Sequence, residues 1–253
     1  MQTLGRNLVN TNGVGKKFNA KVVNRRTLLL VIVCLGLAIL GVYGWIGYRE
    51  SVTDRSLFTG RPCAPPCWQG IIPGGTSAEE ALQIVQSSPY VKRKSVETTG
   101  SYALGAIWAY WKINSGGVSI GLRDGLVHEI GFNTPYRLTL EEVVEEFGEP
   151  EALVLYQAGL PEHLRWGLTI YYPATGMEFS MGTAGPFRDP SIKPSMQVGG
   201  VRFVTPQSSL EGLLAEPYAP YEEDYLEHSR RWRGYGRMFE IYYGSEEDAL
   251  WFG

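Results

Sequence analysis

Three residues near the middle of the chain have the types and spacing of a hydrolytic site. Ser119 lies at the centre of residues 117–121 (GVSIG), which match the G-x-S-x-G string of α/β-hydrolases, and Asp124 and His128 follow closely. In those enzymes the serine stands on a sharp turn between a strand and a helix. Here glycine turns flank an alternating strand and no helical pattern follows. We therefore predict a strand edge, with an extracytoplasmic hydrolase as the alternative.

Cys63 and Cys67 enclose a proline-rich turn and are the only cysteines besides Cys34. Their C-x3-C spacing is one residue longer than the C-x-x-C of thioredoxin-like redox sites. A zinc site would need two further ligands, and the three histidines of the chain are isolated in sequence. In an oxidising compartment two cysteines this close most simply form a disulfide. We predict a structural disulfide, with free thiols or metal and redox chemistry as alternatives, and we predict no cofactor.

Four aromatic residues form a candidate ligand face. Side chains alternate along a strand, so Trp108 and Tyr110 share one side of a strand expected over residues 106–113. Trp166 and Tyr172 share one side of a later strand in the same way. Such rings can line a surface for a sugar or a partner protein. Packing between a sheet and its helices is the alternative interpretation.

These residues follow a continuous apolar run over residues 27–48, which contains no charged side chain. A helix of this length is about 33 Å long, against about 30 Å for the hydrocarbon core of a bilayer. A secretory signal peptide has an apolar region of about 7–15 residues, shorter than this run. We predict an uncleaved transmembrane helix, with a cleaved signal peptide or a lipoprotein modified at Cys34 as alternatives.

The distribution of charge gives this helix a direction. Residues 1–48 contain six basic and no acidic residues, so 17 of the 23 basic and all 26 acidic residues lie beyond them. Basic residues beside a spanning helix stay in the cytoplasm, and Arg25 and Arg26 adjoin the apolar run. We therefore expect a plasma-membrane protein with a cytoplasmic N-terminus and an extracytoplasmic C-terminal part. The acidic balance of that part excludes nucleic acid as its partner.

A helix pattern occurs twice beyond the membrane segment. Residues 77–85 align without gaps with residues 139–147, and each begins with a capping box, Ser77 with Glu80 and Thr139 with Glu142. Apolar residues occupy matching helical positions in both. A weaker third copy begins over residues 209–214. Repetition at this spacing predicts a tandem architecture.

Strand patterns follow each helix pattern. We expect three strands after each of the first two, over residues 106–113, 117–122 and 126–132, and then over 164–172, 177–181 and 201–204. After the third, residues 218–233 are expected to add a helix and residues 238–243 a strand. The predicted fold class is α+β, a transmembrane helix followed by tandem units of a helix and an antiparallel sheet.

The expected parts of the chain follow from these patterns. They are a basic cytoplasmic tail (1–26), a transmembrane helix (27–48), a linker with the disulfide turn (49–67), a first unit (68–135), a second unit (136–205) and a partial third unit (206–253).

Short motifs at both helices carry a resemblance to a known superfamily. Residues 73–77 (PGGTS), residues 138–143 (LTLEEV) and residues 148–150 (GEP) resemble the G-x-T-x-x-E-V...G-x-P signature of the SmpA/BamE and β-lactamase-inhibitor-like superfamily. The string around Cys67 and Trp68 also resembles a group of bacterial envelope proteins. The resemblance implies a β-lactamase-inhibitor-like fold and a binding or scaffold module, and it implies no catalytic residue. A spanning helix replaces the lipobox of the BamE type, so a role in outer-membrane assembly is not carried over.

The sequence thus predicts a single-pass, membrane-anchored extracytoplasmic module that binds a protein or a cell-wall component.

Overall fold

The computed structural model describes residues 25–51, 54–60, 62–101, 104–112, 115–134, 136–158, 165–182, 191–214, 226–244 and 250–251. The chain divides into two compact units, residues 1–48 and residues 49–253.

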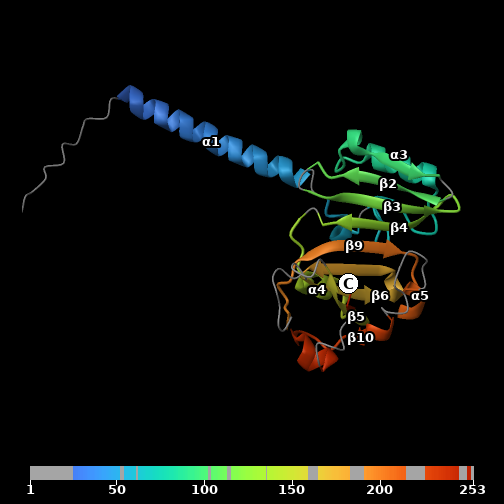
Figure 1. Cartoon of the computed structure of the whole chain (residues 1–253). Helices are drawn as coiled ribbons and strands as arrows, with labels where there is room; N and C mark the ends of the chain where they lie inside the picture. The colour runs from blue at the N-terminus through green and yellow to red at the C-terminus, as the bar shows by residue number, and fades with distance from the viewer. Residues whose placement is uncertain are drawn as a thin grey trace, which may run out of the picture. The chain divides into compact units, whose positions relative to one another are not determined.

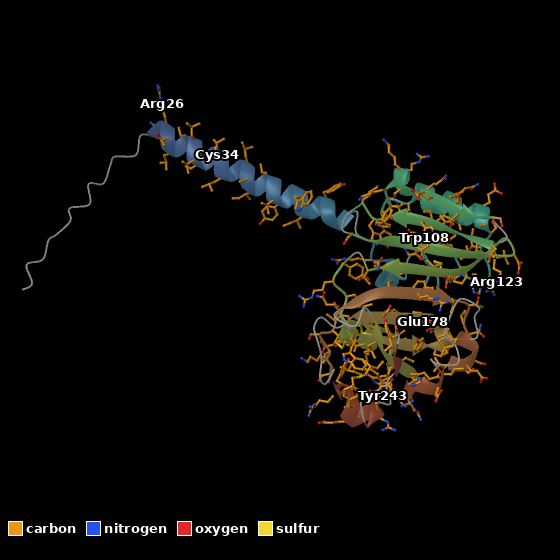
Figure 2. The ribbon with its side chains drawn as sticks, in the orientation of Figure 1. Arg26, Cys34, Trp108, Arg123, Glu178 and Tyr243 are labelled. Carbon is orange, nitrogen blue, oxygen red and sulfur yellow. A yellow bond between two sulfur atoms is a disulfide. The ribbon has the colours of Figure 1, made fainter. Side chains whose placement is uncertain are left out.

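The first unit contains one long helix, α1 (Arg25–Ser51). Its segment Arg25–Tyr48 is long and apolar enough to cross a membrane, and no part of that segment is buried inside the protein. The rings of Trp45 and Tyr48 lie 6.1 Å apart near one end, where aromatic residues gather in spanning helices. Cys34 is exposed along its length (Figure 2). Helix α1 is therefore a candidate membrane anchor.

A large sheet forms the second unit (Figure 1). Within the described residues its strands follow the order β1-β2-β3-β4-β9-β7-β6-β5-β10, and β12 pairs with β5 outside that path. The neighbours along that path are antiparallel, and β12 runs parallel to β5. The strands are β1 (Glu97–Gly100), β2 (Leu104–Tyr110), β3 (Gly117–Arg123), β4 (Leu126–Asn133), β5 (Ala152–Ala158), β6 (Arg165–Tyr172), β7 (Met177–Gly182), β9 (Val198–Val204), β10 (Arg230–Arg231) and β12 (Leu250–Trp251). A separate pair joins β8 (Ser191–Ile192) to β11 (Gly236–Arg237).

The helices of this unit are short. They are α2 (Ser56–Thr59), α3 (Ala78–Ser87), α4 (Leu140–Phe147) and α5 (Leu210–Leu214), with 3-10 turns at Arg93–Ser95 and Pro173–Thr175 and a π-helix, η4, at Phe239–Tyr243. The capping box predicted at Thr139 is complete, and Ser77 accepts a hydrogen bond from the Glu80 N–H. The structure therefore confirms the α+β class, with helices at the three positions where the sequence predicts them.

The two faces of the sheet are packed differently. Helices α3 and α4 share the larger hydrophobic core with one face of the sheet, which includes Ile107, Ile120 and Ile170. On the other face a smaller cluster packs α5 against β5, β6 and β9, with Val154, Tyr171 and Val204 among its members. Because side chains alternate along β5 and β6, neighbouring residues there enter different clusters. Both faces of this half of the sheet are thus covered.

One expectation about an individual strand is wrong. The segment expected as a strand over residues 238–243 forms the π-helix η4 instead. Tyr242 and Tyr243 are adjacent and both are buried, with hydroxyls bonded to the Gly234 and His228 carbonyls. Both rings enter the same, larger core, whereas neighbouring residues of a strand point to opposite faces, as Tyr171 and Tyr172 do on β6. In addition, the sequence patterns did not indicate β1 and β5.

The helix expected over residues 218–233 lies partly outside the described residues. Its described end is helical over residues 226–228 and then enters the short strand β10. The first and second predicted units are joined in one sheet, because β4 pairs with β9.

Candidate functional site

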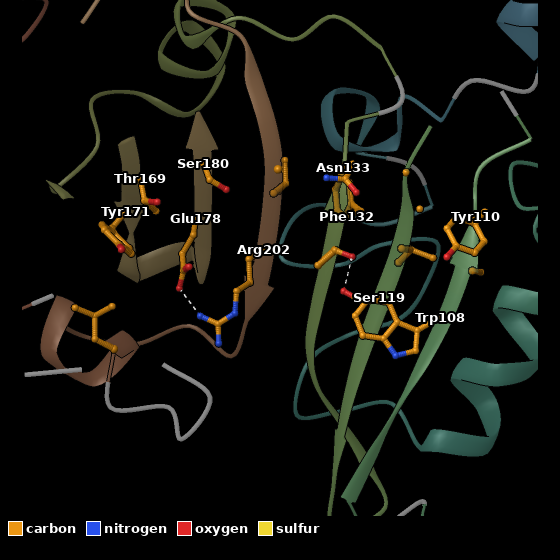
Figure 3. A pocket seen from close by; sticks show the side chains of 18 residues that line it. Trp108, Tyr110, Ser119, Phe132, Asn133, Thr169, Tyr171, Glu178, Ser180 and Arg202 are labelled. Atoms are coloured by element: carbon orange, nitrogen blue, oxygen red, sulfur yellow. Dashed lines mark hydrogen bonds and ion pairs between the residues drawn. The ribbon is translucent and has the colours of Figure 1, made fainter. Parts of the chain in front are cut away.

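A hollow of about 510 Å³ lies over the face of the sheet opposite α3 and α4. The pairing of neighbouring strands sets one row of directly opposite residues across this hollow. Trp108 on β2 pairs with Ser119, Ser119 with Gly131, Gly131 with Arg202, Arg202 with Glu178, and Glu178 with Tyr171. In Figure 3 the rings of Trp108 and Tyr110 stand on one side, and Glu178, Thr169 and Tyr171 on the other. Six strands therefore contribute to one surface.

The first wall of the hollow is aromatic. Trp108 and Tyr110 are 50% and 58% exposed, while Ile107 and Ala109 between and beside them are buried in the core. The alternation of β2 sends the two rings away from α3. Because exposed large rings contribute much contact area at low entropic cost, this pair is suited to hold a ligand.

The floor of the hollow is made of small residues. A Cβ atom added to Gly131 would lie 2.9 Å from the Ser119 hydroxyl oxygen, and one added to Gly200 would lie 3.0 Å from that of Ser180. These separations are shorter than ordinary contacts, so glycine makes room for the neighbouring hydroxyl in each case. The Ser119 hydroxyl donates to the Gly131 carbonyl at 3.2 Å. The strands therefore form a shallow, polar floor.

The second wall contains a charged trio, Arg202 with Glu129 and Glu178. Arg202 Nε lies 2.7 Å from Glu129 Oε2, and Arg202 Nη1 lies 2.7 Å from Glu178 Oε1. The third guanidinium nitrogen, Nη2, is buried and makes no hydrogen bond with the described residues. Burial raises the pKa of Glu178 above its ordinary value, although Arg202 opposes the shift. One donor of the trio thus has no partner in the described chain.

A second hollow continues from the first. It shares Gly116 and Asn133 with the first and extends along Tyr136, Arg137 and Gln197. Its volume is about 670 Å³. Together the two hollows offer a surface longer than a single small molecule requires.

The structure separates the four aromatic residues predicted as a ligand face. Trp108 and Tyr110 line the hollow, whereas Trp166 and Tyr172 are only 1% and 7% exposed. Trp166 packs edge to face against Phe239, and the Tyr172 hydroxyl donates to the Gly148 carbonyl at 2.8 Å. The second pair therefore lies in the core, as the packing interpretation of these rings expects.

The three residues of the hydrolase motif are not gathered into one site. Ser119 lies on β3, and its hydroxyl is directed to the Gly131 carbonyl. Asp124 occupies the turn after β3, and His128 lies three residues before Gly131 on β4, a distance of about 10 Å along a strand. Strand β3 leads through a turn into β4, where a nucleophile elbow would lead into a helix. The hydrolase alternative therefore loses its support.

The cysteine pair stands away from the hollow. Cys63 and Cys67 lie at disulfide distance, with Cα atoms 5.7 Å apart, as the sequence predicts. The following residue, Trp68, is buried, and its indole N–H donates to Asp54 Oδ2 at 2.5 Å. The carboxylate of Asp54 is buried as well, so this bond fixes the start of the second unit against its core.

The residues that sequence reasoning missed are those of the second wall. Arg202 lies 73 residues from Glu129 and 24 residues from Glu178 in the sequence, so no local motif indicates the trio. Among the described residues, no group of three His, Cys, Asp or Glu side chains is placed to hold a metal ion.

No protein-family model, curated protein or solved structure matches the chain. The fold and the hollow therefore define its class on their own, as an α+β sheet protein with a candidate membrane anchor.

Proposed function

We propose that the chain is a single-pass membrane protein that presents a binding module outside the cytoplasm, and that the hollow is the ligand face of that module. The charge asymmetry around α1 supports this orientation, because residues 1–26 carry six basic and no acidic side chains, whereas the part beyond the span carries 17 basic and 26 acidic ones. The Cys63 and Cys67 pair supports it too, since disulfides persist in oxidising compartments.

A tandem architecture of β-lactamase-inhibitor-like type is part of this proposal. Equivalent backbone hydrogen bonds join the start of α3 to the start of β4, and the start of α4 to the start of β9. The bonds are Val127 N–H to the Thr76 carbonyl (2.8 Å) and Ala78 N–H to the Gly125 carbonyl (2.9 Å), and then Val198 N–H to the Leu138 carbonyl (2.9 Å) and Leu140 N–H to the Met196 carbonyl (2.9 Å). Thr76 and Leu138 occupy the same place in the two aligned helix motifs. Shared register of this kind supports two copies of one unit.

The pairing of β4 with β9, where the two proposed copies meet, also supports the tandem hypothesis. Val198 lies 71 residues after Val127, and Arg202 lies 71 residues after its own partner Gly131. A local two-fold axis that exchanges the copies would therefore pass between Gly131 and Arg202. The same offset relates Phe132 to Phe203, whose rings meet edge to face at 5.5 Å. The proposed axis crosses the floor of the hollow.

One observation carries the functional part of the proposal. Two large exposed rings face a partly buried charged trio across a floor of small residues. A cluster of large exposed rings beside a concave surface with a few placed polar groups is the usual form of a binding site.

The proposal is tested with the full chain in lipid nanodiscs, immobilised and exposed to cell-envelope material containing both proteins and glycans. Wild type is compared with Trp108→Ala and with Tyr235→Ala. Tyr235 is a matched control, because it is also a partly exposed aromatic residue but lies near Glu141 and Glu145 of α4. We expect a component that the wild type and Tyr235→Ala retain and that Trp108→Ala loses. Equal retention by all three chains, or no retention, would contradict the proposal.

A further inference from the structure

The hollow allows its ligand to be described by chemistry, on the basis of the function proposed above. We infer that it binds an uncharged pyranose ring of a glycan, which stacks on Trp108 and exchanges hydrogen bonds with Arg202 and Glu178.

The first argument concerns the donor left at the hollow. Arg202 Nη2 is buried without a partner among the described residues, and burying such a donor unsatisfied is costly. The other two nitrogens of the guanidinium are held by Glu129 and Glu178, so Nη2 is fixed in position. Nη2 is closed off in this structure, so a ligand reaches it only with a small shift of the Arg202 side chain, which is 23% exposed. An acceptor oxygen brought to Nη2 by that shift would remove the cost.

The second argument concerns charge. Arg202 and Glu178 are the charged residues among those that line the hollow, and Glu129, outside that lining, pairs with Arg202. With both carboxylates ionised the trio carries a net charge of −1, and protonation of Glu178 brings it to zero. A phosphate or carboxylate ligand would find no net positive field here. A hydroxyl group fits better, because it can accept from the guanidinium while it donates to a carboxylate.

The third argument concerns the aromatic wall. A pyranose ring carries neighbouring hydroxyls on its edge, which can exchange hydrogen bonds with Arg202 and Glu178. The C–H groups of its flat face are apolar. Trp108 and Tyr110 lie two residues apart on the same face of β2, so they present adjacent rings. The negative face of an aromatic ring attracts these weakly positive C–H groups. A sugar is thus complementary to both walls at once.

The size of the site agrees with this ligand. Pockets for small ligands have volumes of about 300–1,000 Å³, and the first hollow has about 510 Å³. The second hollow shares Gly116 and Asn133 with it and offers room for a second ring. Charged residues are depleted at the centre of a protein–protein interface, whereas the Arg202–Glu178 pair lies in this hollow. We therefore favour a glycan over a protein as the occupant.

The test uses the full chain in nanodiscs and three uncharged probes, cellotetraose, maltotetraose and the tetramer of N-acetylglucosamine. Binding is followed by calorimetry. At least one probe is expected to bind the wild type. Trp108→Ala should weaken it about tenfold through loss of the stacked ring. Arg202→Lys should weaken it by a similar factor, because lysine keeps a positive charge between the carboxylates but removes the forked nitrogen.

Tyr235→Ala serves as the control and should bind like the wild type. Circular dichroism on every variant separates loss of binding from loss of fold, and Trp108, being half exposed, can be removed without opening the core. If no probe binds while an envelope protein is retained through Trp108, the glycan inference is overturned and the proposed function stands. If neither is bound, both are overturned. Binding that persists unchanged in Trp108→Ala and Arg202→Lys also overturns the inference.

Discussion

Arg202 Nη1 lies 2.7 Å from Glu178 Oε1, and this bond links β9 to β7 at the wall of the hollow. The carboxylate is buried, and burial raises its pKa even though the arginine stabilises the ionised form. The hollow therefore contains a group whose protonation changes the net charge of its surroundings.

The Glu178–Arg202 pair predicts a specific dependence of stability on pH. The pKa of Glu178 is higher in the folded chain than its ordinary value of 4.5, which holds in the unfolded chain. At a pH between these two values the native state keeps a proton that the unfolded chain has released. The contribution of Glu178 to stability is therefore greatest below pH 4.5 and falls as pH rises through the folded pKa.

Glu178→Gln removes the titrating group but keeps an acceptor for Arg202. We expect the stability of the wild type relative to this variant to decrease as pH rises above 4.5, measured by thermal unfolding of the full chain in detergent micelles. A difference that is constant with pH, or that grows with it, would contradict the assigned shift.

Asp54 is predicted to hold the entry of the second unit in place. Asp54→Ala leaves the buried indole N–H of Trp68 without its acceptor and should destabilise the unit by about 1–3 kcal/mol. Asp54→Asn retains one acceptor oxygen and should cost less. Glu146→Ala, an exposed carboxylate on α4, is the control and should change stability by less than about 0.5 kcal/mol. Chemical unfolding of the full chain measures all three, and equal effects for the two Asp54 variants would argue against the hydrogen bond.

The sequence could predict the helices better than the sheet. Ser77 and Thr139 indicate helix starts through local capping chemistry, and they are the N-cap residues of α3 and α4. Strand β5 is buried on both faces, so its apolar run lacks the alternation that marks a strand. The order of the sheet could not be read either, because the pairing of β4 with β9 joins residues about 70 apart in the chain.

The sequence predicts which aromatic residues of the candidate site lie side by side, but not which face of the sheet they occupy. Alternation along β2 and β6 places Trp108 with Tyr110 and Trp166 with Tyr172, but it does not tell which side of each strand the helices cover. That depends on how α3 and α4 pack, and only the first pair ends on the open face. The trio around Arg202 depends on strand register, which no short motif encodes.

The glycine floor predicts a mutation with a matched rescue. Gly131→Ala places a methyl group 2.9 Å from the Ser119 hydroxyl oxygen and should cost about 1–3 kcal/mol. Ser119→Ala removes that oxygen, so the double variant should recover most of the loss. Thermal unfolding of the four chains forms a complete cycle. Simple additivity of the two changes would contradict the contact.

The proposed orientation predicts the result of a protease experiment. In sealed right-side-out membrane vesicles, added protease should digest the part of the chain beyond α1, and in inverted vesicles that part should be protected. The digestion is followed with antibodies to each end of the chain, and detergent lysis is the control for intrinsic resistance. Protection in right-side-out vesicles would reverse the orientation.

The most direct test of the ligand face is hydroxyl-radical footprinting of the full chain in nanodiscs, with and without saturating envelope extract. Mass spectrometry then reports the oxidation rate of each exposed aromatic side chain. We predict that the extract slows oxidation of Trp108 and Tyr110, which line the hollow, and leaves that of Tyr235 unchanged. Unchanged oxidation of Trp108 in the saturated sample, or protection confined to Tyr235, would contradict the account.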